Sequence, residues 1–179
     1  MSAKLADRRA RGADATLARD FRRALGRFAS GVTVITTADG DDVHGMTANG
    51  VLSVSLEPPL VLVSLGNRCR MTDMLATTGR YGISVLGEEH ERLSWHFAGS
   101  TEARLTPEFS WRGSPAQPFI PDALAHIGGE VVDAHPAGDH TLFIARVSHL
   151  EYRDGQPLVF YSGRYRNLRV GLRDDLFFY

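Results

Sequence analysis

Near the start of the chain, apolar residues recur at steps of three and four. Leu17, Phe21, Leu25 and Phe28 follow this spacing, and four arginines stand between them. The spacing places the apolar side chains along one stripe of an α-helix and the arginines on its other side. We therefore expect an amphipathic helix over residues 16–28.

After this helix the pattern changes to one that is typical of β-strands. The segment VTVITT is rich in β-branched residues, and the turn-forming ADGDD separates it from VHGMTANGVLSVSL. These segments predict a hairpin. The Glu57-Pro58-Pro59 stretch should interrupt the sheet, because proline has no amide hydrogen to donate. LVLVSL then predicts an inner strand, since it is apolar on both faces.

In the middle of the chain, short helices and strands follow one another. We expect a helix from about Arg70 to Thr77, a strand at YGISVL, and a helix from about Glu88 to Phe97 whose acidic first turn suits the helix dipole. Residues 98–121 contain four of the eight prolines, which predicts a long irregular excursion. The last third predicts two longer strands around a Pro-Ala-Gly-Asp turn, followed by a shorter strand.

Strands thus outnumber helices, and turns join most neighbouring strands. This arrangement favours a mostly β fold, an antiparallel barrel with flanking helices, over a doubly wound parallel sheet. The length of 179 residues is that of one domain, which we place at 16–179 after a mobile tail at 1–15. A Gly-x-Gly-x-x-Gly fingerprint opening a helix is absent, so a nucleotide would not be bound in the Rossmann manner.

The charges of the chain nearly cancel. Lys and Arg number 20 against 21 Asp and Glu, a formal net charge of −1 at pH 7, which is too weak to gather nucleic acid or an anionic membrane. The chain has no apolar run near the roughly 18 residues of a membrane helix. These features favour a cytoplasmic protein with a small-molecule partner. A transit peptide containing Arg8, Arg9 and Arg11 is the alternative for the N-terminus, although Asp7 and Asp14 count against it.

Small and hydroxyl-bearing residues interrupt the strand pattern between residues 44 and 64. Backbone amides and the side chains of Thr47, Asn49 and Ser53 can approach a polar ligand there, such as a phosphate or a sugar. His135 and His140 lack the spacing of a standard metal site, and we expect no metal.

The same segment, GMTAN followed by SVSLEPPLVLV, resembles the flavin-binding segment of the flavin reductase family, the reductase components of two-component flavin-dependent monooxygenases. Gly138-Asp139-His140 resembles a second motif of that family, and FYSGRYR at 160–166 a third. The resemblance implies a six-stranded antiparallel split β-barrel that binds FMN and forms a homodimer. It also implies that NADH or NADPH reduces FMN or FAD, and that reduced flavin passes to a separate monooxygenase.

The resemblance further assigns roles to single residues. It implies that His140 lies beside the nicotinamide and that Tyr165 closes the pocket. The residues implied to line the flavin are Met46, Thr47, Ala48, Asn49, Ser53, Val54, Ser64, Leu65, Asn67, Cys69 and Arg70. Phe97 is a further candidate for the flavin edge. Gly50 and Cys69 stand where serine is common in the family.

Other interpretations stay open at this point. His140 could be a turn histidine that bonds the backbone, Arg70 a solvated arginine, and Phe97 a core residue. For the whole chain, the alternatives are a flavin-binding carrier or sensor without turnover, and another split-barrel oxidase such as one acting on pyridoxine phosphate. Oxidation of NADH or NADPH in the presence of excess flavin separates the reductase from the carrier.

Overall fold

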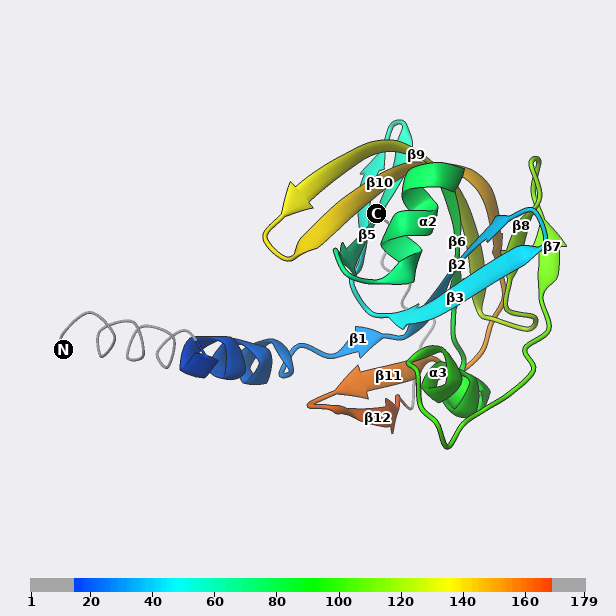
Figure 1. Ribbon diagram of the computed structural model, residues 1–179. Coiled ribbons are helices and arrows are strands. Elements are labelled where there is room, and N and C mark those ends of the chain that lie inside the picture. The colour runs from blue at the N-terminus through cyan, green and yellow to red at the C-terminus, as the bar shows by residue number, and fades with distance from the viewer. Residues whose placement is uncertain (1–14, 169–179) are drawn as a thin grey trace.

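Seven antiparallel strands form the main sheet of the protein, whose computed structural model describes residues 15–168. Their order is β3-β2-β6-β9-β10-β5-β4 (Figure 1). The strands are β2 (Thr33–Asp39), β3 (Asp42–Ala48), β4 (Val51–Leu56), β5 (Pro59–Gly66), β6 (Arg80–Val85), β9 (Ala125–Ala137) and β10 (His140–Tyr152).

The two edge strands of this sheet, β3 and β4, follow each other in the chain. Asn49 and Gly50 alone join them, so the two edges must lie close together at that end. Within the described residues no hydrogen-bonded ladder connects β3 to β4. The expected antiparallel split barrel is confirmed as a fold class, but its main sheet has seven strands where six were expected.

Two small sheets and three helical segments complete the described fold (Figure 1). One sheet contains β1 (Ser30–Gly31), β11 (Leu158–Tyr161) and β12 (Arg164–Asn167), and the other pairs β7 (Ser110–Arg112) with β8 (Gln117–Phe119). The helices are α2 (Arg70–Thr78), the 3-10 turn η1 (Glu88–His90) with α3 (Glu91–Phe97), and the N-terminal helix at 15–25. The helices therefore lie close to the expected positions.

α2 covers one face of the main sheet (Figure 1). Met71 and Leu75 on this helix are buried against Ile35 and Ile83 of the sheet, in the larger of two apolar clusters. The helix ends at Gly79, whose φ of 63° is left-handed and suits a residue without a Cβ. This packing fixes β2 and β6 beneath α2, and with them the start of β3.

The segment at 98–121 is more ordered than expected. It contains the β7–β8 hairpin, and Phe119 and Ile120 are buried. Phe119 fits because Gly82 of β6 has no side chain: a Cβ there would lie 2.8 Å from Phe119 Cε1. The prolines correctly indicated that the chain leaves the main sheet, but a buried aromatic residue brings it back to the core.

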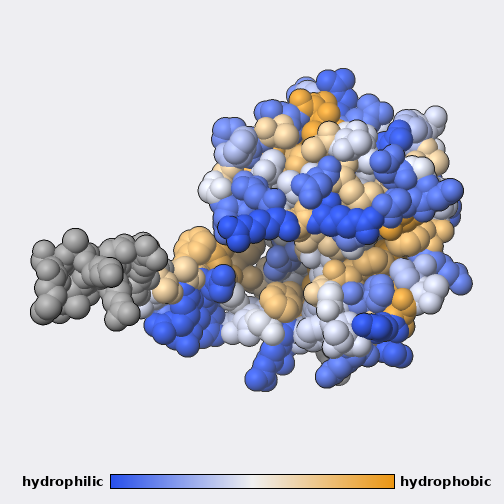
Figure 2. All heavy atoms as spheres, viewed as in Figure 1, coloured by the Kyte–Doolittle hydropathy of each residue, from blue (hydrophilic) through white to orange (hydrophobic). Residues whose placement is uncertain are grey.

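The N-terminal helix follows the predicted amphipathic pattern but ends at residue 25 rather than 28, so Phe28 lies in the turn after it. The apolar side of this segment is exposed. Leu17, Phe21, Leu25 and Phe28 are between 55% and 77% exposed. The helix projects from the body in Figure 1, and Figure 2 shows its apolar side next to open space. A hydrogen bond of 2.8 Å from Ser162 N to the carbonyl oxygen of Gly26 ties the end of the helix to the β11–β12 turn.

Within residues 15–168, no helix is both long enough and apolar enough to cross a membrane. The cytoplasmic location expected from the sequence remains a prediction. The mobile tail expected at 1–15 lies outside the described residues except for residue 15, and the single domain at 16–179 also remains a prediction.

Candidate functional site

A pocket of about 310 Å³ opens beside the end of β3, and we call it the aromatic pocket. It gathers residues that precede β2, end β3, belong to the α3 region and form β11 and β12. Its lining residues are Val32, Thr47, Ala48, Asn49, Trp95, Ala98, Phe160, Gly163 and Tyr165. Three of the predicted flavin-lining residues and the predicted closing residue, Tyr165, therefore meet in one place.

Hydroxyl groups hold the polar wall of the aromatic pocket together. Thr47 Oγ1 donates a hydrogen bond of 2.7 Å to the carbonyl oxygen of Ser94. Ser94 Oγ lies 2.6 Å from the Tyr165 hydroxyl, and Ser94 is fully buried. These contacts join β3, α3 and β12, so the polar groups are in place before a ligand arrives.

Aromatic rings form the apolar wall. The rings of Trp95 and Tyr165 meet edge to face with centroids 5.1 Å apart, and the Phe160 and Tyr165 centroids lie 5.6 Å apart. Trp95 is 44% exposed, so part of its surface remains free. An apolar wall opposite a few fixed polar groups suits a flat heteroaromatic ring.

The β3–β4 link lies against the end of β5. Ser64 N donates a hydrogen bond of 2.9 Å to the carbonyl oxygen of Gly50. A Cβ at Gly50 would lie 3.3 Å from both Ser64 Cβ and the Ser64 carbonyl oxygen. Glycine at this position therefore allows a close approach that a serine would crowd, which gives a packing reason for the departure from the family pattern.

A second group of predicted residues lies where β5 ends beside the β9–β10 turn. Asn67 N donates to the Asp139 carbonyl oxygen at 2.9 Å. The Asn67 side chain donates from Nδ2 to the Gly138 carbonyl oxygen at 3.3 Å and accepts from Thr141 Oγ1 at 2.8 Å. Asn67 thus holds the turn that carries Gly138-Asp139-His140.

His140 stands half-exposed at this turn. Its Nδ1 lies 2.7 Å from Asp139 Oδ1, and its side chain is 47% exposed. The hydrogen bond from His140, together with the positive charge of its protonated ring, lowers the pKa of Asp139. Because the Asp139 carboxylate is ionised near neutral pH, it accepts from Nδ1–H, and Nε2 is the nitrogen left for a ligand.

Three further predicted residues have side chains that are already engaged within the protein. Two lie in or against the core, and the third has a charged partner. Leu65 is 1% exposed, so only its backbone can face a ligand. Cys69 packs against the core with its Sγ 3.9 Å from Met46 Sδ. Arg70 forms an ion pair and hydrogen bond with Asp42 at the surface. A phosphate at Arg70 would therefore compete with an existing carboxylate.

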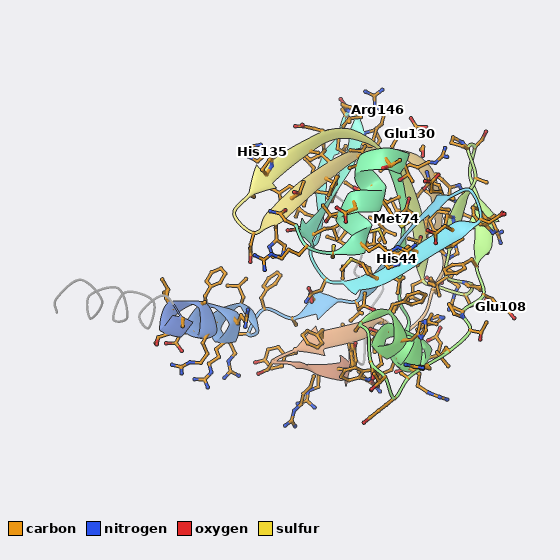
Figure 3. All side chains as sticks on the ribbon, in the orientation of Figure 1. His44, Met74, Glu108, Glu130, His135 and Arg146 are labelled. Atoms are coloured by element: carbon orange, nitrogen blue, oxygen red, sulfur yellow. The ribbon has the colours of Figure 1, made fainter. Side chains whose placement is uncertain are left out.

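Ser53, Val54 and Phe97 do not line the aromatic pocket. Ser53 and Val54 are exposed on β4. Phe97 lies over Gly45, where a Cβ would come within 2.6 Å of its ring. It lines a neighbouring pocket of about 340 Å³ together with His44, which Figure 3 labels on β3. A role of these residues in flavin binding remains a prediction.

Several residues around the aromatic pocket were not predicted. Phe160 and Gly163 belong to the FYSGRYR segment, so the resemblance of that motif to the family could have predicted both residues. Trp95 shows only the spacing of a helix residue, which does not point to a pocket. Ser94 has no signal in the sequence, because its role arises from its contacts with Thr47 and Tyr165.

Comparisons with known proteins agree on one family. The family model described as flavin reductase like domain matches residues 25–169. An NADH-dependent flavin reductase of Rhodococcus sp is 52% identical over 158 residues, which is 87% of this chain and 89% of that protein. The 4-hydroxyphenylacetate 3-monooxygenase reductase component of Thermus thermophilus is 36% identical over 149 residues, covering 83% of this chain and 95% of that protein.

A solved structure supports the same relationship. The flavin reductase PheA2 in its native state superposes with a TM-score of 0.82 at 45% identity, covering 85% of this chain and 98% of that chain. The region matched by the family model contains both the aromatic pocket and the Gly138-Asp139-His140 turn.

Proposed function

The chain belongs to the family of flavin reductase like domains, and we propose that it uses NADH to reduce FMN or FAD. In this reaction the nicotinamide gives a hydride to the oxidised flavin, a proton from water completes the reduced flavin, and NAD⁺ leaves. The part of the protein is to hold two flat rings in contact and in the right orientation.

The observation that carries this proposal is the aromatic pocket with its fixed hydroxyl wall. Thr47 and Tyr165 are already oriented through Ser94, and Asn49 offers an exposed amide at the rim. Trp95 supplies a partly free aromatic surface. Polar groups on one side and rings on the other match a flavin or nicotinamide ring, whose heteroatoms lie along its edges.

We assign the nicotinamide to the side of the site that carries His140. Asp139 engages Nδ1 of this histidine, which leaves Nε2 for the carboxamide of the nicotinamide. Asn67 fixes the turn by three hydrogen bonds. His140 is therefore the proposed catalytic residue, and Asn67 is a positioning residue.

Reduced flavin would then pass to a separate flavin-dependent monooxygenase. The relative from Thermus thermophilus is named as a reductase component of such a system. Asn49 is exposed and Trp95 half-exposed at the aromatic pocket, which supports a flavin that enters and leaves with each turnover.

A homodimer is the proposed assembly. The N-terminal helix exposes Phe21, the turn after it exposes Phe28, and the edge strand β4 exposes Leu52 (60%) and Leu56 (77%). Aligned apolar side chains on a helix and on an open sheet edge are typical of surfaces that a partner covers. A second copy of this chain would remove both surfaces from water.

The test is NADH oxidation by the purified protein under air, with FMN, with FAD and without added flavin. We expect oxidation that depends on flavin and exceeds the uncatalysed rate, and a lower rate when NADPH replaces NADH. Flavin binding without NADH or NADPH oxidation in any pairing would overturn the proposal and identify a carrier or sensor instead.

A further inference from the structure

A larger pocket of about 510 Å³ lies between the end of the N-terminal helix and the β11–β12 turn, and we call it the arginine pocket. Its lining residues are Arg22, Arg23, Gly26, Arg27, Ser162 and Gly163. The hydrogen bond from Ser162 N to the Gly26 carbonyl oxygen fixes the helix end against the turn. Three arginines, two from the last turns of the helix and one from the turn that follows it, thus line one opening.

The positive charge of the arginine pocket is largely unbalanced. Across residues 15–168, neither Arg22 nor Arg27 forms a hydrogen bond or ion pair with a carboxylate, and Arg23 lies 4.0 Å from Asp20. Arg22 contributes to the low pKa of Asp139, but less than His140 does. The helix end itself carries only about half a negative charge, so the three cations dominate. Guanidinium groups match the geometry of phosphate oxygens, which favours a phosphorylated ligand.

The arginine pocket adjoins the aromatic pocket. Gly163 lines both of them, and its φ of 77° marks the tip of the β11–β12 turn. No side chain at this position stands between the two pockets. A ligand whose flat ring lies against Trp95 and Tyr165 can therefore extend across Gly163 to the arginines.

From these observations we propose that the arginine pocket binds the pyrophosphate group of a dinucleotide whose ring lies in the aromatic pocket. The proposal rests on the proposed function, because that function supplies ligands with both parts. NADH and FAD each join a flat ring to a pyrophosphate, so the chemistry of recognition is shared. The experiment must show which of the two is bound there.

The test compares the R22Q/R27Q double variant with the R19Q control. Glutamine removes each positive charge but keeps a polar side chain. Arg19 lies on the same helix, pairs with Asp20 and does not line the arginine pocket. Binding of NAD⁺ and of FAD is measured by calorimetry at fixed ionic strength, beside nicotinamide mononucleotide and FMN, which lack the pyrophosphate.

We expect the double variant to raise the Kd of NAD⁺ or of FAD by about ten-fold or more, because it removes charge-assisted hydrogen bonds. The mononucleotides should change less, and R19Q should bind all four ligands as the wild type does. A change for NAD⁺ alone assigns the pocket to the nicotinamide nucleotide, and a change for FAD alone assigns it to the flavin.

Two results would overturn the inference: unchanged Kd values for both dinucleotides, or an equal weakening by R19Q, which would indicate only the charge of the helix. A different result tests the proposed function: that function is wrong if the wild type does not oxidise NADH in the presence of flavin. Thermal unfolding of each variant shows whether the fold is retained.

Discussion

At the β9–β10 turn, one carboxylate orients a histidine, and an asparagine holds the turn that carries both. Asp139 engages Nδ1 of His140. Asn67 donates to the carbonyl oxygens of Gly138 and Asp139 and accepts from the Thr141 hydroxyl. Because the pKa of Asp139 is lowered, its carboxylate remains an acceptor through the neutral pH range. His140 is therefore held in one ring orientation through Nδ1, on a side chain that is 47% exposed.

Replacing His140 by asparagine should affect catalysis more than flavin binding. H140N should lower kcat/KM for NADH by about ten-fold or more, because the nicotinamide loses a group that orients it. The Kd for FMN should stay within about two-fold of the wild type, a difference of about 0.4 kcal/mol in binding free energy. Steady-state kinetics and flavin titration supply the two values.

The matched control is H135N. His135 lies on the same hairpin, on the exposed part of β9, where Figure 3 labels it, and the hydrogen bond to Asp139 comes from His140. The H135N variant should retain wild-type kinetics. Equal kcat/KM for H140N and the wild type would show that His140 is a structural turn residue.

Single residues of the site differ in how far the sequence could predict them. Thr47, Asn49 and Tyr165 belong to motifs, and the structure brings them together at one pocket. Ser94 could not be predicted, because a serine on an amphipathic helix shows no pattern of its own. Its importance comes from two hydrogen bonds to segments that are distant in the sequence.

Among the elements, the position of β8 depends on Gly82, a glycine of β6 in the main sheet. A Cβ at Gly82 would come within 2.8 Å of the Pro118 carbonyl oxygen and 2.9 Å of Thr36 Oγ1. The Thr36 hydroxyl also donates to the Pro118 carbonyl oxygen. The hairpin is therefore fastened to β2 and β6 at a point where no side chain can be added.

The G82A variant should destabilise the protein by about 1–3 kcal/mol, since an extra methyl group in a packed core forces the backbone to shift. Urea unfolding would show a lower midpoint with an unchanged slope. Gly31→Ala serves as the control, because a Cβ at Gly31 meets nothing within 4 Å. A G82A midpoint equal to that of the control would contradict the packing described here.

Periodicity predicted the long elements well and the short ones poorly. The apolar spacing of α2 and the β-branched run of β2 are signals that local sequence carries. β8 has only Gln117, Pro118 and Phe119, too few residues for a period of two to appear. Its burial depends on the space above Gly82, which no local pattern reveals.

For the whole molecule, the exposed apolar side of the N-terminal helix predicts a dimer that substitutions can weaken. Replacing Phe21 and Phe28 by serine should shift the protein toward monomer at micromolar concentration, because both side chains are more than half-exposed in one chain and would be covered by a second. Sedimentation velocity measures the shift. An R19Q variant on the polar side of the helix is the control, and a wild type that sediments as a monomer would contradict the proposed dimer.

The sequence predicted this helix but not the exposure of its apolar side. An apolar stripe shows that a surface is to be covered, whether by the same chain or by another. The pattern at residues 16–28 is the same in both cases. Only the structure distinguishes the two cases, because it places the helix outside the body of its own chain (Figure 1).

The proposed reaction passes a hydride from NADH to a flavin bound on the same protein. The most direct measurement mixes the protein and oxidised FMN or FAD with NADH in a stopped-flow instrument without oxygen, and follows the loss of the oxidised flavin absorbance. We predict a rapid loss that depends on the protein and saturates with NADH. A bound flavin that is reduced no faster than free flavin under the same conditions would contradict the proposed hydride transfer.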